Sequence, residues 1–353
     1  MTPIKDKGSI DEFTEPIKFI DLFCGIGGFR FAIQSVAKQN NYKPICVLSS
    51  DIDVAAQDAY EANFGDRPLG DITKVSAIDV PDHDILLGGF PCQAFSIIGD
   101  GKGFNDARGT LFFDIARILK EKNPRAFVLE NVKQLRGHDH GKTLEVILKI
   151  LVELGYWVDY RVLNALDFGL PQKRERILIV GFKRGTQGSF KWPKPKPESM
   201  TPLEEILEDD RDVPKEYFAS EKIRLSRKDA VAGKNLPKGR TIWHENKSGN
   251  ISALTYSCAL RAGASYNYLL VDGKRRLTMR EMLNLQGFPK SFKIVCNYSE
   301  TRKQAGNSVP VPMIAAVLNE VLKVMKNNTS ESTDLKDTDY SAAVHQESLP
   351  INF

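Results

Sequence analysis

The chain has 353 residues, of which 42% are hydrophobic and 27% are charged. This is the composition of an ordinary folded protein, and the length is long for one domain and comfortable for two. No apolar run approaches the ~20 residues that a membrane helix needs, and residues 1–15 lack the apolar core of a secretory signal. We therefore expect neither a membrane protein nor an exported one.

The formal net charge of +4 is small, but the charges are unevenly distributed. Residues 222–280 contain 13 Lys and Arg against 3 Asp and Glu, whereas residues 327–353 contain 1 against 5. The first segment would attract a polyanion and the second would not. Basic side chains are often only a solvated surface, which we expect for at least half of those in 222–280.

Five cysteines are scattered along the sequence with no CxxC pair: Cys24, Cys46, Cys92, Cys258 and Cys296. Disulfide frameworks and zinc sites need clustered cysteines, so the pattern predicts a reducing, cytoplasmic environment and no metal. Most of these thiols are expected to be small buried hydrophobic groups.

The first half of the sequence alternates short apolar runs with helical periodicity, which is typical of a parallel sheet covered by helices. We predict strands over 17–23, 44–50, 85–89 and 126–130, helices over 29–37, 54–64, 110–120 and 143–154, and a closing pair of strands over 156–163 and 176–182. The fold class is therefore α/β.

The sequence changes character near Lys191. Residues 192–197 alternate proline with other residues, so they are expected to form a stiff, extended connector. The acidic segment that follows is predicted to be partly helical over 198–212, the basic stretch after it has no clear periodicity, and helical patterns return over 276–287 and 311–325. The expected organisation is an extension over 1–16, a first domain over 17–184, a smaller loop-rich domain over 185–275, a return segment over 276–326 that completes the first domain, and a mobile tail over 327–353.

A glycine-rich turn follows the first predicted strand and opens a helix, in the pattern Phe23-x-Gly25-x-Gly27-Gly28. Glycines let the backbone approach a ligand, and a helix N-terminus presents free N–H groups. The spacing is neither that of dinucleotide binders nor that of a phosphate loop. An acidic residue at the end of the second strand, Asp51 or Asp53, suits a ribose diol; a tight turn without a ligand is about equally frequent.

A second pattern lies at the ends of two later strands. Cys92 stands between Pro91 and Gln93 at a strand end, where α/β sheets bind ligands and where a structural cysteine is unusual. Glu130 ends the neighbouring strand, so the two side chains are expected to share a pocket. Residues 172–176 add cations just before another strand, although such a run is more often only solvated.

Six segments in this order resemble the bacterial DNA (cytosine-5)-methyltransferases over most of residues 17–325. They are Asp21–Phe29, Gly89–Ser96, Glu130–Val132, Gln172–Ile177, Arg276–Pro289 and Gln304–Val309. The resemblance implies an S-adenosylmethionine-dependent methyltransferase domain of Rossmann-like α/β fold with a mixed sheet, a catalytic cofactor-binding domain over 17–184 and a DNA target-recognition domain over 185–275.

The resemblance assigns four catalytic residues. Cys92 would be the thiolate that adds to C6 of cytosine, and Glu130 would hold N3 and the exocyclic amine. Arg174 and Arg176 would steady the ring oxygen and lower the pKa of the thiol. The cytosine must be flipped out of the duplex to be reached.

The resemblance also assigns the S-adenosylmethionine site. Phe23 would stack on adenine, Gly25 and Gly27 would allow close backbone approach, and Asp51 would take the ribose hydroxyls. The family more often has Glu at the position of Asp51, so Asp53 is the fallback. The remaining cofactor residues implied are Ile52, Asp71, Ile72, Pro91, Leu111, Asn307 and Val309.

The DNA contacts are implied only in outline. Residues 96–108 carry three glycines and correspond in the family to the loop that closes on DNA, with Ser96 and Ile98 as candidate contacts. The pair Leu254-Thr255 partly matches a signature of the recognition domain. Basic candidates are Arg261, Lys274 and Arg275. Three tyrosines, Tyr256, Tyr266 and Tyr268, are expected to belong to the local core.

The predicted function is a sequence-specific DNA (cytosine-5)-methyltransferase, with double-stranded DNA as its partner and no metal. A cognate restriction endonuclease that forms no stable complex with it, a monomeric state and a bacterial, nucleoid-associated location are further expectations, and the tail after Lys326 is predicted to be dispensable. Three alternatives remain: a transfer-RNA cytosine methyltransferase, disfavoured because the Cys-Phe-Thr tripeptide of those members is absent; an inactive DNA-binding protein on the same scaffold; and an NAD-dependent oxidoreductase.

Overall fold

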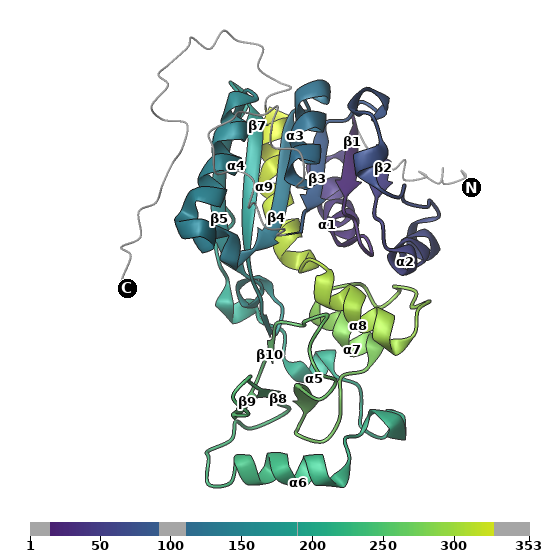
Figure 1. Ribbon diagram of the computed structural model, residues 1–353, viewed down its shortest axis with the longest axis vertical. Helices are drawn as coiled ribbons and strands as arrows, with labels where there is room; N and C mark the ends of the chain where they lie inside the picture. The colour runs from purple at the N-terminus through teal and green to yellow at the C-terminus, as the bar shows by residue number, and fades with distance from the viewer. Residues whose placement is uncertain (1–14, 92–110, 189, 328–353) are drawn as a thin grey trace, which may run out of the picture.

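The computed structural model describes residues 15–91, 111–188 and 190–327. A six-stranded sheet forms the centre of the upper part of the molecule, with the strand order β2-β1-β3-β4-β7-β5 (Figure 1). The strands are β1 (Glu15–Leu22), β2 (Tyr42–Ser50), β3 (Ile85–Gly89), β4 (Ala126–Val132), β5 (Tyr156–Asn164) and β7 (Glu175–Lys183). β1 to β4 pair in parallel, and β7 is antiparallel to both β4 and β5. The predicted α/β fold with a mixed sheet is confirmed.

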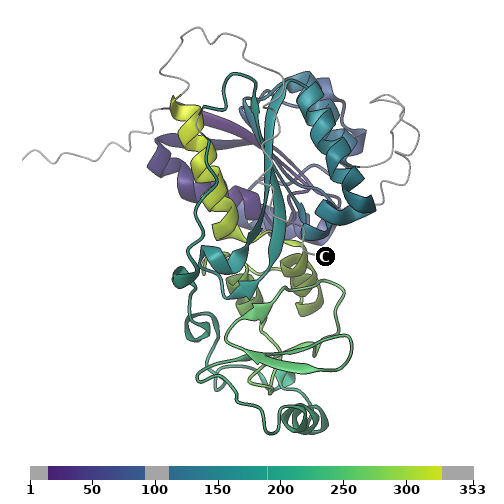
Figure 2. The same cartoon turned by 90° about the vertical axis from the view of Figure 1, so that its left-hand side faces the viewer.

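Helices cover both faces of this sheet (Figure 2). They are α1 (Gly28–Ala37), α2 (Val54–Phe64), α3 (Leu111–Lys122), α4 (Lys142–Glu153) and α9 (Val311–Asn327). One apolar cluster packs α1 and α9 on one face, and a second packs α3 and α4 on the other. Phe19 belongs to the first cluster and Ile20 to the second, because successive side chains of a strand point to opposite faces.

The continuous segment Tyr298–Asn327 is long and apolar enough to cross a membrane by length and composition alone. It contains α8 (Tyr298–Asn307) and α9, and 61% of its most apolar window is buried inside the protein. Met313, Val317 and Val321 of α9 are fully enclosed in the cluster that contains α1. Its apolar character is therefore that of a core helix.

The lower part of the molecule is built from short elements (Figure 1). They are α5 (Leu203–Ile206), α6 (Glu221–Ala230), a sheet of β8 (Ile242–Glu245), β9 (Ile251–Leu254) and β11 (Leu269–Val271), and α7 (Met279–Leu285). β10 (Ser257–Cys258) pairs with β6 (Gln172–Lys173), which joins this part to the strand end before β7. Short 3-10 helices are Lys38–Asn40, Ile72–Lys74, Ala77–Asp79, Lys133–Gly141, Ala165–Phe168, Pro197–Ser199 and Lys215–Tyr217. The predicted helix over 276–287 is shorter than expected, because Thr278 caps α7 with a capping box to Glu281.

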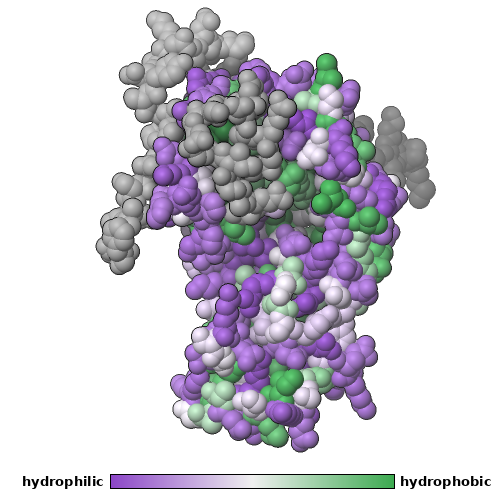
Figure 3. All heavy atoms as spheres, viewed as in Figure 1, coloured by the Kyte–Doolittle hydropathy of each residue, from purple (hydrophilic) through white to green (hydrophobic). Residues whose placement is uncertain are grey.

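The surface seen from the front is predominantly hydrophilic, with hydrophobic side chains in small groups (Figure 3). Two of the exposed large hydrophobic residues, Ile52 and Val54, stand close to the carboxyl end of β2. The predicted domain boundaries remain predictions, and the tail from residue 328 onward lies outside the described residues.

Candidate active site

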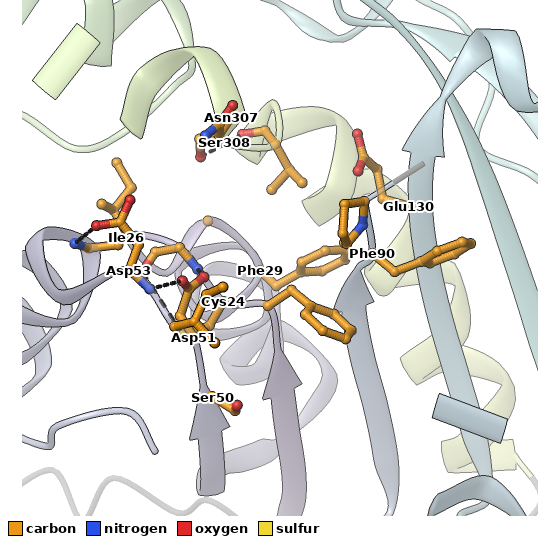
Figure 4. Close-up of a pocket in the computed structure, with 18 of the residues that line it drawn as sticks. Cys24, Ile26, Phe29, Ser50, Asp51, Asp53, Phe90, Glu130, Asn307 and Ser308 are labelled. Carbon is orange, nitrogen blue, oxygen red and sulfur yellow. Dashed lines mark hydrogen bonds between the residues drawn. The ribbon is translucent and has the colours of Figure 1, made fainter. Parts of the chain in front are cut away.

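A cavity of about 600 Å³ opens at the carboxyl ends of β1 to β4. This is the edge at which open α/β sheets bind ligands, and the size suits a small-molecule site. It brings together most of the residues predicted from the sequence: Phe23, Gly25, Asp51, Ile52, Asp71, Ile72, Pro91, Leu111, Glu130, Arg174, Arg176, Asn307 and Val309. Figure 4 shows Asp51 and Asp53 on one side, Glu130 on the other and Asn307 above.

The glycine-rich turn forms one wall of this cavity. Phe23 and Gly25 both have positive φ, at 56° and 52°, and a Cβ added at Gly25 would meet no atom within 4 Å. The space beside Gly25 is therefore open to a ligand. Gly27 (φ 84°) does not line the cavity, and a Cβ there would lie 2.2 Å from the Phe64 ring. Packing on α2, rather than ligand approach, requires glycine at position 27.

Two carboxylates follow β2. Asp51 accepts hydrogen bonds from the backbone N–H groups of Gly25 (2.8 Å) and Asp53 (2.9 Å). Burial raises the pKa of Asp51, and these two N–H groups oppose the rise. Each carboxylate oxygen has two lone pairs, so Asp51 keeps acceptor capacity for a sugar hydroxyl.

Asp53 is more fully engaged. It caps α2 by accepting from the N–H groups of Ala55 and Ala56, and its other oxygen pairs with Lys303 of α8 at 2.7 Å. Burial acts to raise the pKa of Asp53, but the Lys303 ammonium and the two N–H groups outweigh it and hold the pKa below its usual range. Asp51 is therefore the more available of the two carboxylates.

Another wall of the cavity carries Asp71 and Ile72. Asp71 accepts from the N–H (3.0 Å) and the hydroxyl (2.7 Å) of Thr73, and these bonds lower its pKa. Ile72 is buried, whereas Ile52 is 73% exposed. An apolar side chain left this open at a cavity wall is available to cover a flat ring.

Glu130 lies at the end of β4, opposite the glycine turn. Its Oε1 is 2.7 Å from Nε of Arg176 on β7, which pairs with β4 through Arg176 and Val132. Burial raises the pKa of Glu130, while Arg176 and Arg174 oppose the rise. The pair places a carboxyl with a perturbed pKa and one cation in a sheltered site, which suits proton chemistry.

The chain reaches Cys92 through a turn that is held in place. Asn131, next to Glu130, donates its Nδ2–H to the Phe90 carbonyl at 2.8 Å. This fixes the peptide before Pro91. Cys92, Ser96 and Ile98 lie outside the described residues. The sequence prediction did not include Asn131, although its place beside Glu130 in the Glu-Asn-Val motif was the signal that could have found it.

Arg174, for which a catalytic role was predicted, is held mainly by backbone groups. Its side chain is 1% exposed, and both terminal nitrogens donate to backbone carbonyls. No carboxylate lies within ion-pair distance of it among the described residues. Burial, with Arg176 adding to the effect, lowers the pKa of Arg174 to about 9. Three of its four terminal N–H groups therefore hold backbone in place, while Arg174 still lines the cavity.

The predicted DNA contacts fall into two groups. Leu254 ends β9 and Thr255, next to it, is exposed, as are Arg261 and Lys274. Arg275 is fully buried and donates to Glu281, Asp210 and two backbone carbonyls, so the prediction that it contacts DNA is wrong. Its charge holds the protein together instead.

The three tyrosines expected in the local core also divide. Tyr268 is buried, and Tyr256 is half-buried. Tyr266 is 45% exposed, and the guanidinium carbons of Arg276 and Arg302 lie 5.7 and 4.4 Å from the centre of its ring. The core prediction is therefore wrong for Tyr266.

No group of three or more His, Cys, Asp or Glu side chains that could hold a metal ion occurs within residues 15–91, 111–188 and 190–327. The cavity offers backbone N–H groups, carboxylates and one buried carboxyl–guanidinium pair. These groups suit a polar organic ligand with a sugar and a flat ring, and they define an α/β enzyme that binds a nucleoside-type cofactor.

Comparison with known proteins identifies the family. The chain belongs to the C-5 cytosine-specific DNA methylase family, which it matches over residues 17–323. It is a DNA (cytosine-5)-methyltransferase, and membership implies S-adenosylmethionine as the methyl donor. The NAD-dependent oxidoreductase and the RNA-modifying alternatives are thereby set aside.

Individual relatives agree with this assignment. The chain is 56% identical to the type II methyltransferase M.NgoBI of Neisseria gonorrhoeae over 299 residues, covering 85% of this chain and 91% of the relative. M.HhaI of Haemophilus parahaemolyticus, whose motifs are similar to those of this chain, is 43% identical over 331 residues, covering 89% of this chain and 95% of the relative. The fold is similar to that of a mutant DNMT2 from Spodoptera frugiperda, with a TM-score of 0.67 at 20% identity, covering 86% of this chain and 99% of that one.

Proposed function

We propose that this DNA (cytosine-5)-methyltransferase is the modification enzyme of a type II restriction–modification system. The similarity to M.NgoBI, which is named a type II methyltransferase, over most of both chains supports this. A cognate endonuclease would cut the same unmethylated sequence and would need no stable complex with this chain. We further propose that the enzyme acts as a monomer without a metal ion, in the bacterial cytoplasm on nucleoid DNA.

The observation that carries the chemical proposal is the convergence of Glu130, Arg176 and the Pro91 turn on one cavity. Cys92 is the next residue after Pro91 in the sequence. In the proposed mechanism the Cys92 thiolate adds to C6 of a flipped-out cytosine, forming a C–S bond and placing negative charge on the ring. This addition makes C5 nucleophilic, and after C5 has taken the methyl group, loss of the C5 proton breaks the C–S bond and releases the Cys92 thiolate.

Glu130 would manage the proton that this addition requires. Its raised pKa favours the protonated form more than in an ordinary glutamate, so the carboxyl can hold a proton at N3 while its second oxygen accepts from the exocyclic amine. Arg176 holds the Glu130 Oε1 at 2.7 Å and so orients the carboxyl toward the ring. Arg174 is proposed to support this site indirectly, through the backbone segments that it binds.

The S-adenosylmethionine site is proposed on the opposite wall. When bound, S-adenosylmethionine supplies an electrophilic methyl group. Asp51 would accept from the ribose hydroxyls, Phe23 and Ile52 would flank the adenine, and Asp71 with Ile72 would hold its amine edge. Leu111, Pro91, Asn307 and Val309 would enclose the methionine end. The open space beside Gly25 and the remaining acceptor capacity of Asp51 fit such a ligand.

The test is transfer of tritium from labelled S-adenosylmethionine to unmethylated plasmid DNA, followed by bisulfite sequencing of the product. We expect the wild-type enzyme to label cytosines in one short recurring sequence, and Cys92→Ser to lose the activity. Cys258→Ser is the matched control, because this half-buried thiol is not part of the proposed chemistry. Full activity in Cys92→Ser would refute the nucleophile, and label scattered over unrelated sequences would refute the type II assignment.

A further inference from the structure

Arg174 joins three segments that are far apart in the sequence. Its Nη1 donates to the Leu260 carbonyl at 3.1 Å, and its Nη2 donates to the carbonyls of Gly306 (2.9 Å) and Ser308. Leu260 follows β10, in the part of the chain proposed to recognise DNA. Gly306 and Ser308 flank Asn307 in the wall of the cofactor cavity.

The attachment of Arg174 to the rest of the protein is rigid. Its backbone N–H donates to the Asn164 side chain, and its carbonyl accepts from Ala165 N–H, so it is fixed to the end of β5. The side chain is 1% exposed, and its Nε has no hydrogen-bond partner among the described residues. A buried charge that is compensated mainly by backbone carbonyls is costly to keep unless those carbonyls remain in place.

The segment around Leu260 and the segment around Asn307 also contact each other directly. A Cβ added at Gly306 would lie 2.5 Å from the Ala262 backbone nitrogen and 2.9 Å from the Arg261 carbonyl carbon. Gln172 accepts from Leu260 N–H, and the Tyr268 hydroxyl accepts from Arg261 N–H at 3.0 Å. Residues 260–262 therefore cannot shift without displacing either the Arg174 guanidinium or the backbone around Asn307.

We infer that Arg174 is a positioning residue that couples the DNA-recognition part of the chain to the methionine end of the cofactor cavity. When DNA fixes residues 260–262, the guanidinium fixes the carbonyls on both sides of Asn307, and cofactor binding fixes the same carbonyls from the other side. Each ligand therefore tightens the binding of the other by the same factor. The inference rests on the proposed cofactor site and names the residue through which that site is linked to DNA.

The experiment measures the dissociation constant of S-adenosylhomocysteine by titration calorimetry, with and without a saturating duplex. The duplex carries the sequence that bisulfite mapping identifies. For the wild-type enzyme we expect the duplex to tighten binding about 10-fold, within the usual range of such couplings. In Arg174→Met we expect this ratio to fall to about one, and in Arg174→Lys, which keeps the charge but not the fork of donors, to an intermediate value.

The ratio separates coupling from mere support of the fold. A purely structural role would weaken S-adenosylhomocysteine binding equally with and without DNA, leaving the ratio at the wild-type value, and that result would overturn the inference. Arg125→Met is the matched control. Arg125 also donates to a backbone carbonyl of a buried residue, Met325, but it lies far from the cavity. Its ratio is expected to equal that of the wild type.

A second variant covers the case in which changes at Arg174 prevent folding. Tyr268→Phe keeps the buried ring but removes the acceptor for Arg261 N–H, so it loosens residues 260–262 from the other side. We expect it to lower the ratio while leaving the melting temperature close to that of the wild type, and an unchanged ratio would count against the inference. If the wild-type enzyme bound S-adenosylhomocysteine without any coupling, the inference would fail alone; if it did not bind the compound, the cofactor site would fail first.

Discussion

The six-stranded sheet of the catalytic part is held together differently from the outer half of the lower part, which contains α6 and the sheet of β8, β9 and β11. Two large apolar clusters enclose the sheet on both faces. The outer half of the lower part contains a cluster of three buried residues, Val231, Trp243 and Ile251. The lower part also shares the first apolar cluster, through residues such as Ile242, Leu269 and Val271. It adds ion pairs between its short elements: Arg227–Glu245, Arg240–Asp210, Arg240–Asp272, Arg275–Asp210 and Arg275–Glu281.

This difference explains where function is placed. A rigid apolar sheet fixes strand ends to within fractions of an ångström, so Glu130 and Arg176 can be set at 2.7 Å. The short elements of the lower part are joined partly by charged side chains, so the segments between them can change sequence with less loss of core packing. We expect the part of the chain that is proposed to read DNA to benefit from that freedom, and the part that performs one fixed reaction not to.

The largest effect on stability is expected from a substitution that breaks the buried ion pairs of the lower part. Arg275 and Glu281 are both fully buried and share two hydrogen bonds, at 2.9 and 2.8 Å. Arg275→Met leaves Glu281 buried without its cation, so we expect the free energy of unfolding to fall by about 3–5 kcal/mol. Urea titration monitored by tryptophan fluorescence measures this, since Trp243 reports on the lower part and Trp157 on the sheet.

The double variant sharpens that result. Arg275→Met combined with Glu281→Gln removes both charges while Gln can still accept from the Thr278 N–H of the capping box, so we expect it to be clearly more stable than Arg275→Met alone. Equal stabilities would mean that the pair contributes through packing, and the contrast between an apolar sheet and an ionic lower part would then be mistaken.

The same contrast decides what could be predicted from the sequence. The helix over 54–64 and the strand over 85–89 were predicted to the residue, because Asp53 and Gly65 cap the two ends of the helix and the strand is a short apolar run. α6 was missed, since Arg227 is its only buried residue and its sequence is mostly charged. α8 was also missed, for its buried face is made of Thr, Gln, Ala and Gly.

The site was predicted unevenly for a related reason. Strand ends locate Asp51, Glu130 and Arg176, and the described residues bring these three to one cavity. Arg174 and Arg176 have different partners because of three-dimensional packing, which the sequence does not show. Arg176 pairs with Glu130, while Arg174 donates to carbonyls more than 80 residues away along the chain. Buried Arg275 was mistaken for a DNA contact because sequence alone does not distinguish a solvated arginine from one that holds an internal ion pair.

A pH effect of intermediate size is expected from the sheet itself. Asp21, at the end of β1, is fully buried, and neither carboxylate oxygen has a hydrogen-bond partner among the described residues. Burial raises its pKa from 3.8 to about 8, with Arg30 opposing and Asp51 adding to the rise. Between about pH 4 and pH 8 the folded protein therefore binds one proton more than the unfolded chain, so stability falls as pH rises through this window.

Asp21→Asn removes this dependence. We expect the free energy of unfolding of the wild type to fall, relative to that of the variant, by up to roughly 3 kcal/mol between pH 5 and pH 8. Urea titrations at both pH values measure it, and Asp82→Asn, at a side chain that is 92% exposed, is the control. A difference between wild type and Asp21→Asn that stays constant with pH would show that the carboxyl is ionised in the folded protein throughout.

The smallest effect on stability, and the most specific one on function, is expected at Gly25. Gly25 and Gly65 both have positive φ, at 52° and 82°, and a Cβ at either would meet no atom within 4 Å. Alanine at either position should therefore cost about 1–2 kcal/mol of stability through the backbone alone.

Only Gly25 lines the cofactor cavity, so only Gly25→Ala places a methyl group where the ligand must approach. We expect it to weaken S-adenosylhomocysteine binding about 10-fold, a loss of roughly 1.4 kcal/mol, while Gly65→Ala binds as the wild type does. Equal affinities in the two variants would mean that the turn serves only to connect β1 to α1, and that the cofactor lies elsewhere along the strand ends.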